Sequence, residues 1–199
     1  MATKSILKRG FKAEAERIVS DYKQKLNIHA CAPLCGFKLA KYLNIEIINA
    51  TDFLKDEDEI KRLSGENCEE YGWSALTMNT KKGNRIIIHN NFHNPARQQS
   101  NIMHEIAHII CDHKVKEQNH NFNIPFGMRY YDELQEEEAI YLGATLQLSK
   151  PCLFWANKRN MSNSEIANYF NASIEMVTFR MNTKGIAKRN NFKVNANSK

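Results

Sequence analysis

The sequence has little of the cysteine that a disulfide-stabilised secreted protein needs. Its five cysteines are odd in number and scattered, and no two of them form a CxxC pair. This usage is typical of reduced thiols in a cytoplasmic protein rather than of a disulfide framework. Cys31 and Cys35 are a candidate metal pair, but Pro33 lies between them and no second pair exists elsewhere. We therefore interpret both thiols as packing residues.

Long hydrophobic runs are also missing. No apolar run approaches the roughly 20 residues that a membrane-spanning helix needs. The first ten residues, MATKSILKRG, contain no apolar core of the kind that a signal peptide has. Hydrophobic residues make up 42% and charged residues 25% of the 199-residue chain, which is globular composition. We therefore expect a cytoplasmic protein with one main core and no membrane partner.

Acidic side chains are scarce in the last third of the chain. Residues 139–199 contain nine basic residues and only two acidic ones, whereas residues 1–138 contain 19 basic and 20 acidic ones. The net charge of +6 therefore comes entirely from the last third. Such an excess is typical of a surface that faces nucleic acid or an acidic protein, and a solvated basic face and tail is an equally good interpretation.

The pattern of apolar residues gives a coarse fold. Apolar residues recur at helical spacing over residues 11–27, 34–43 and 132–148. Strands are predicted at residues 45–48, 72–79 and 85–89, and Gly83-Asn84 forms the turn between the last two. The sequence thus predicts an α+β fold in which a small antiparallel sheet lies beside helices.

The stretch HEIAHIICDH, residues 104–113, carries most of the chemistry. Pro95 is placed near the start of a helix that has a broad apolar face. His104 and His108 are about one turn apart on that helix, so both imidazoles project from the same side and can bind one zinc ion. Glu105 lies about 100° round the helix, where it can take a proton from the water that the ion acidifies.

The alternative to a zinc site is an ordinary polar edge on a buried helix. Random shuffling of this composition gives HExxH in roughly two per cent of chains, so chance is a weak explanation. A strand, a turn, a strand and then this helix is also the arrangement that zinc proteases use. We therefore interpret the motif as a metal site.

A catalytic zinc ion needs a third protein ligand. His113 is five residues after His108, about 140° round the helix, so we expect a surface histidine or one that supports a ligand. Asp112 is on the histidine face and could orient an imidazole. A better source of the ligand is the acidic start of the helix at 132–148, DELQEEE, although the helix dipole alone also favours carboxylates there.

These motifs resemble the ImmA/IrrE family of gluzincin-type metallopeptidases, which has a zincin-like core. The second motif of that family is a glutamate, two residues, an alanine, often an asparagine, and an apolar run ending near a proline. The resemblance implies Glu136 as the third zinc ligand in preference to Glu137 and Glu138. Ile140 departs from the pattern, because the family commonly has asparagine there. The residues that match in register are Glu136, Ala139, Leu142, Gly143, Leu146, Leu148 and Pro151.

The stretch MSNSEIANYFNASIEMVTFRMNTKGI resembles a helix-turn-helix, which family members carry after the peptidase core. Ser162 and Glu165 form a predicted capping box, and Ser173 can cap a second helix over residues 174–181. The alternative is a helical pair that simply packs on the zinc domain. Beyond Thr178 and Arg180, the second helix offers few side chains that read bases, so sequence-specific DNA contact is not expected.

The sequence therefore predicts a zinc metallopeptidase core over residues 1–150 and a helical, helix-turn-helix-like segment with a basic tail over residues 151–199. In this prediction zinc (Zn²⁺) is held by His104, His108 and, as the resemblance implies, Glu136, and Glu105 is the general base. A group that stabilises the oxyanion should also exist, and the sequence does not choose among its candidates. These candidates are Tyr71, Tyr130, Tyr131, His89 and His93.

The resemblance implies a regulatory protease that cleaves a helix-turn-helix repressor in the bacterial cytoplasm, often encoded by a mobile element or phage or serving a stress regulon. The rival hypothesis is a non-proteolytic DNA-binding or protein-interaction regulator that uses the zincin fold as a scaffold. We expect the basic C-terminal run to dock the substrate protein rather than operator DNA. This run contains Arg180, Lys184, Lys188, Arg189 and Lys193.

Overall fold

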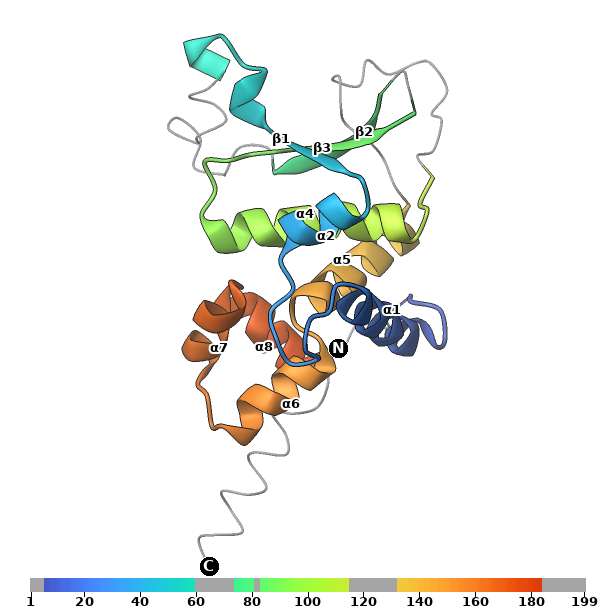
Figure 1. The fold of residues 1–199 in the computed structure, drawn as a ribbon, viewed down its shortest axis with the longest axis vertical. Coiled ribbons are helices and arrows are strands. Elements are labelled where there is room, and N and C mark those ends of the chain that lie inside the picture. The colour runs from blue at the N-terminus through green and yellow to red at the C-terminus, as the bar shows by residue number, and fades with distance from the viewer. Residues whose placement is uncertain (1–5, 60–73, 81–82, 115–131, 184–199) are drawn as a thin grey trace, which may run out of the picture.

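The computed structural model describes residues 6–59, 74–80, 83–114 and 132–183, which form a mainly helical α+β fold (Figure 1). The first half contains the helices α1 (Phe11–Lys25) and α2 (Gly36–Tyr42), the strand β1 (Glu46–Asn49), the 3-10 helix η1 (Ala50–Asp52) and the strands β2 (Ala75–Asn79) and β3 (Arg85–His89). The second half is helical and contains α4 (Pro95–Ile110), α5 (Glu133–Gln147), α6 (Lys150–Lys158), α7 (Asn163–Phe170) and α8 (Ile174–Thr183).

The sheet has three strands in the order β1-β3-β2. β2 and β3 form the predicted antiparallel hairpin, and Gly83 has a φ of +81°, which glycine adopts without steric cost. β1 is parallel to β3, so the prediction of an antiparallel sheet holds for the hairpin and not for β1. The direction of β1 depends on where the long connection to β2 carries the chain, which the residues of β1 do not specify.

The sheet, α4 and α5 lie in successive layers, and α1 packs on α5 (Figure 1). One cluster of buried hydrophobic side chains joins α1, α2, β3, α4 and α5, and a second joins α6, α7 and α8. Fully burying a leucine, isoleucine or phenylalanine side chain contributes about 1.5–3 kcal/mol. The main cluster includes Val19, Leu39, Ile87, Ile106 and Leu142, and the second includes Leu148, Leu153, Ile166, Phe170 and Val177.

Local signals explain where several helices begin. Pro95 is in the first turn of α4, and the side chain of Asn94 accepts a hydrogen bond from the backbone N–H of Arg97. Ser162 and Glu165 form the predicted capping box at the start of α7. α6 was not expected from the sequence, because a nine-residue helix carries too short a periodic signal.

Arg180 is fully buried between the C-terminal helices and α1. Its Nε donates to the carbonyl oxygen of Leu148 at 2.9 Å, and its Nη2 lies 2.9 Å from Oε1 of Glu16 on α1. The other oxygen of Glu16 accepts a hydrogen bond from the backbone N–H of Lys150 at the start of α6. Arg180 is therefore not exposed to read bases or to dock a partner, which corrects both sequence expectations for this residue.

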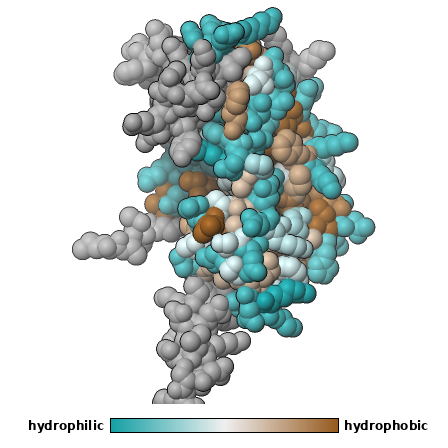
Figure 2. All heavy atoms as spheres, turned by 90° about the vertical axis from the view of Figure 1, so that its left-hand side faces the viewer, coloured by the Kyte–Doolittle hydropathy of each residue, from teal (hydrophilic) through white to brown (hydrophobic). Residues whose placement is uncertain are grey.

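The surface is mostly hydrophilic on the face shown in Figure 2, where apolar residues appear as small patches among polar ones. In the part of the chain that the structure describes, no helix is both long and apolar enough to cross a membrane.

Candidate metal centre

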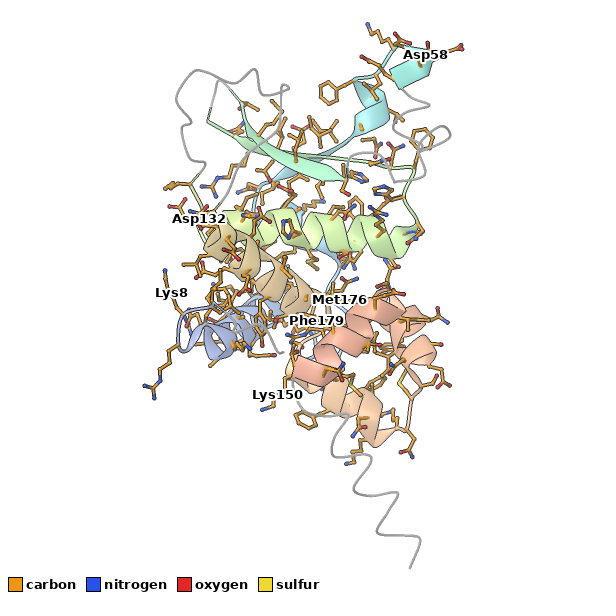
Figure 3. The ribbon with its side chains drawn as sticks, turned by 180° about the vertical axis from the view of Figure 1, so that it is seen from behind. Lys8, Asp58, Asp132, Lys150, Met176 and Phe179 are labelled. Atoms are coloured by element: carbon orange, nitrogen blue, oxygen red, sulfur yellow. The ribbon has the colours of Figure 1, made fainter. Side chains whose placement is uncertain are left out.

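A glycine at the crossing of α4 and α5 sets the distance between the two helices. A Cβ atom on Gly143 would lie 3.1 Å from Cα of His104 and 3.2 Å from the carbonyl oxygen of Met103. The two backbones therefore approach this closely only because residue 143 has no side chain. The start of α5, marked by Asp132, lies near the C-terminal end of α4 (Figure 3). Glu136, about two turns before Gly143, is thereby held beside the histidines of α4.

Three side chains from these two helices converge on one point. The Nε2 atoms of His104 and His108 are 3.1 Å apart. Oε2 of Glu136 lies 3.4 Å from Nε2 of His104, and its Oε1 lies 3.5 Å from Nε2 of His108. Among the described residues, this is the one group of three or more histidine, cysteine or acidic side chains that could hold a metal ion. His108 is buried, whereas His104 and Glu136 are partly exposed, so the group is open on one side.

The donor set and its spacing fit a zinc ion. Zinc binds imidazole nitrogen and carboxylate oxygen at about 2.0–2.2 Å with tetrahedral geometry, so two of its ligand atoms are about 3.3 Å apart. The three separations of 3.1, 3.4 and 3.5 Å bracket this value. Three protein ligands leave a fourth position open, which is typical of a catalytic rather than a structural zinc site.

The ionisation of the nearby side chains also suits a cation. A hydrogen bond with His104 lowers the pKa of Glu136 below its ordinary value, and the charge of His108 lowers it further, against the opposing effect of partial burial. Glu136 is therefore a carboxylate at neutral pH. Burial, together with the nearby Glu138, raises the pKa of the Cys111 thiol to about 11. Cys111 is therefore protonated at neutral pH and is a poor competitor for the metal.

Glu105 lies on the side of α4 that faces the sheet. Its carboxylate is largely buried, and its Oε2 accepts a hydrogen bond of 2.6 Å from the hydroxyl of Thr77 on β2. This bond holds one carboxylate oxygen in a fixed position. Sequence reasoning did not identify Thr77, because alternation predicts a strand but not which of its side chains meets the helix below.

The end of α4 corrects the expectation for Asp112. In the described structure its carboxylate pairs with Lys114 at 2.7 Å and with Arg85 at 3.3 Å rather than with an imidazole. The backbone of Asp112 has a φ of +52°, which ends the helix and reverses the chain. The N–H of His113 then donates to the carbonyl oxygen of His108, and that of Asp112 donates to Ile109, as in a Schellman motif. His113 is thereby folded back against His108.

Two of the five oxyanion candidates fall in the described part of the chain, and Tyr71, Tyr130 and Tyr131 lie outside it. His89 is buried at the end of β3 with its Nε2 3.1 Å from Oδ1 of Asn49, and burial lowers its pKa despite the opposing charge of Asp52. His93 is half-buried, and its Nδ1 is 3.1 Å from Nδ2 of Asn101, about one turn before His104 on α4. His93 therefore contacts the helix that carries the ligands, and its role stays a prediction.

The predicted C-terminal helical pair is present as α7 and α8, with Ser173 capping α8. The one basic residue of these two helices is the buried Arg180. Met176 and Phe179 mark α8 in Figure 3, and Phe179 is exposed. The remaining residues of the predicted basic run, Lys184, Lys188, Arg189 and Lys193, lie outside the described residues.

Two histidines one turn apart on a helix, a glutamate from the next helix and a small sheet above them define the HExxH class of metallopeptidase folds. Residues 40–182 match the family described as the IrrE N-terminal-like domain, a peptidase family. The chain belongs to this ImmA/IrrE family of metallopeptidases. No curated protein matches the sequence.

Proposed function

We propose that this protein is a zinc-dependent endopeptidase in which His104, His108 and Glu136 hold the ion. The observation that carries this proposal is the convergence of two imidazole nitrogens and one carboxylate at zinc-ligand spacing on an open side of the molecule. Membership of a metallopeptidase family supports the same conclusion.

Glu105 is the general base in this proposal. Zinc, when bound, polarises the scissile carbonyl and makes a water molecule more acidic. Glu105 accepts a proton from that water and then delivers it to the leaving amine. Thr77 holds one oxygen of Glu105, which keeps the carboxylate in one orientation during both transfers. The burial of Glu105 limits competition from bulk water.

The substrate that we propose is a helix-turn-helix transcriptional repressor, cleaved in the cytoplasm of a bacterium as part of a mobile-element, phage or stress response. This proposal rests on the resemblance to the ImmA/IrrE family and on a site that is open on one side. The division into a peptidase core at residues 1–150 and a C-terminal segment at 151–199 stays a prediction. The second cluster of buried residues, around α6, α7 and α8, supports it, whereas the pair of Arg180 and Glu16 joins these helices to α1.

A non-proteolytic DNA-binding or interaction regulator is the second candidate. The exposed side chains of α7 and α8 carry no positive charge, because the one basic residue of these helices is buried. Phosphate contacts by lysine and arginine supply most of the affinity of a DNA-binding surface. The described C-terminal helices therefore favour the protease over a DNA-binding protein.

Replacing Glu105 with glutamine tests the protease directly. Glutamine keeps the size and one hydrogen-bond acceptor but takes no proton, so cleavage of a co-encoded repressor should fall by on the order of 10²-fold or more. Zinc content should stay at the parent level, because Glu105 is not a ligand. Glu133→Gln on the exposed start of α5 is the matched control and should cleave normally.

Two outcomes would contradict different parts of the proposal. Cleavage by the glutamine variant at the parent rate would refute the assigned base. A His108→Ala variant that keeps stoichiometric zinc would refute the metal site itself.

A further inference from the structure

His108 is supported by a chain of side chains that the HExxH motif does not include. Its Nδ1 lies 2.9 Å from Nδ1 of His113. Nε2 of His113 lies 3.1 Å from Oε2 of Glu138 on α5. Both His113 and Glu138 are nearly buried, with side-chain exposures of 5% and 10%. The carboxylate also has Nζ of Lys8 at 4.0 Å, but the side chain of Lys8 is 73% exposed and this ion pair adds little.

The direction of the hydrogen bonds follows from the proposed ligand. A histidine that binds a metal through Nε2 carries its proton on Nδ1, so Nδ1 of His108 donates to Nδ1 of His113 at 2.9 Å. Nδ1 of His113 is then the acceptor, and its Nε2 donates to the carboxylate of Glu138 at 3.1 Å. The proton on Nδ1 of His108 leaves Nε2 of His108 with a lone pair directed at Glu136 and His104. This tautomer is the one that can bind a metal ion.

We infer that His113 and Glu138 are positioning residues that hold His108 in the tautomer and ring orientation required for zinc. In metal sites a ligating histidine usually donates its second N–H to a carboxylate or carbonyl, and loss of that partner costs about 10–100-fold in metal affinity. Here a second imidazole stands between the ligand and the carboxylate, and the left-handed turn at Asp112 puts it there.

The alternative is that the pair only stabilises the end of α4 against α5. Two replacements of similar size separate these explanations. In His113→Asn the side-chain oxygen takes the place of Nδ1 and can accept from His108, whereas His113→Leu has nearly the same shape and no acceptor. A packing role predicts that leucine, which suits a buried position, serves at least as well as asparagine. A positioning role predicts that the asparagine variant binds zinc more tightly than the leucine variant.

The measurement is the zinc dissociation constant, obtained by competition with a chromophoric chelator of known affinity. His113→Leu should bind zinc about 10–100-fold more weakly than the parent, and His113→Asn should recover part of that loss, because it restores the acceptor for His108 but not the bond to Glu138. Urea unfolding of the zinc-free proteins gives the separate effect on stability. Equal losses in the two variants, or zinc binding by His113→Leu within about twofold of the parent, would overturn the inference.

A second pair of variants decides the question if His113→Leu does not fold. Glu138→Gln keeps an oxygen for His113 but removes the charge, so it should weaken zinc binding, whereas its neighbour Glu137→Gln should not. Equal zinc affinities in these two variants would count against the inference. Nitrogen NMR adds a direct readout, because His108 in the zinc-free parent should carry its proton on Nδ1, and a proton on Nε2 would contradict the assignment.

The inference rests on the proposed zinc site, and zinc binding by the parent and by the leucine variant distinguishes failure of the inference from failure of the site. A parent protein that binds no zinc overturns both. A parent that binds zinc, with a leucine variant that binds it equally well, overturns only the role of His113 and Glu138.

Discussion

Replacing Gly143 with alanine tests whether the close crossing of α4 and α5 builds the metal site. The new Cβ would meet backbone atoms of His104 at 3.1 and 3.2 Å and the carbonyl oxygen of Met103 at 3.2 Å. None of these is a flexible side-chain end, so the helices must separate by a few tenths of an ångström to reach ordinary contact distances. Glu136 is about two turns away on the same helix and must move with it.

Two opposing effects set the size of the change in stability. Alanine is favoured over glycine in a helix by about 1 kcal/mol. Overpacking in a well-packed contact costs about 1–3 kcal/mol, and two facing backbones place this site toward the upper part of that range. The zinc-free variant should therefore lose up to about 2 kcal/mol of unfolding free energy. Its zinc affinity should fall by up to about tenfold, because a displacement of a few tenths of an ångström uses most of the roughly 0.5 Å of misplacement that a metal site tolerates.

The assay is urea unfolding in the presence of a chelator, followed by zinc competition on the same samples. Gly36→Ala on α2 is the control, because its Cβ would meet side-chain atoms of Ile102 and Gln99 rather than the backbone of α4. The control should alter stability while leaving zinc affinity unchanged. A Gly143→Ala protein that gains about 1 kcal/mol of stability and binds zinc as the parent does would refute the reasoning.

Three further results are expected. Glu136→Ala should lose zinc in metal analysis after dialysis while Glu137→Ala keeps it, and the opposite result would move the third ligand. The pKa of Glu136 is lowered in the fold, so its ionised form stabilises the zinc-free protein fully above the ordinary glutamate pKa. This stabilisation is lost as the pH falls through the lowered pKa. Glu136→Gln should therefore weaken the acid dependence of the unfolding free energy measured in urea. Arg180→Met should cost about 3 kcal/mol or more by leaving Glu16 without its buried partner, and unchanged stability would show that the pair contributes little.

Local signals in the sequence predicted much of the fold. The spacing of His104 and His108, the capping box at Ser162 and the proline at the start of α4 act within one or two helical turns, so the sequence alone carries them. The hairpin was predicted for the same reason, since alternating strands flank a turn with glycine. The family resemblance implied Glu136, and the structure brings it to the two histidines.

The errors concern residues whose surroundings come from far along the chain. Arg180 belongs to a basic segment and was expected at the surface. It is instead buried, with hydrogen bonds to Glu16 on α1 and to the carbonyl oxygen of Leu148 at the end of α5. Asp112 was expected to orient an imidazole because helical periodicity was extended two residues beyond the end of α4 at Ile110. Because the backbone of Asp112 is left-handed, His113 rather than Asp112 contacts the imidazole of His108. Thr77 could be identified only once β2 was packed on α4.

Glu16 has a consequence for how the protein can be divided. It lies on α1, before the matched residues 40–182, yet its carboxylate accepts from both Nη2 of Arg180 and the first backbone N–H of α6. Ala15 and Val19 on the same helix are fully buried against the core. A fragment that began at residue 40 would expose this core and leave the buried guanidinium of Arg180 without the carboxylate of Glu16. The region that matches the family, residues 40–182, is thus smaller than the unit that must fold together.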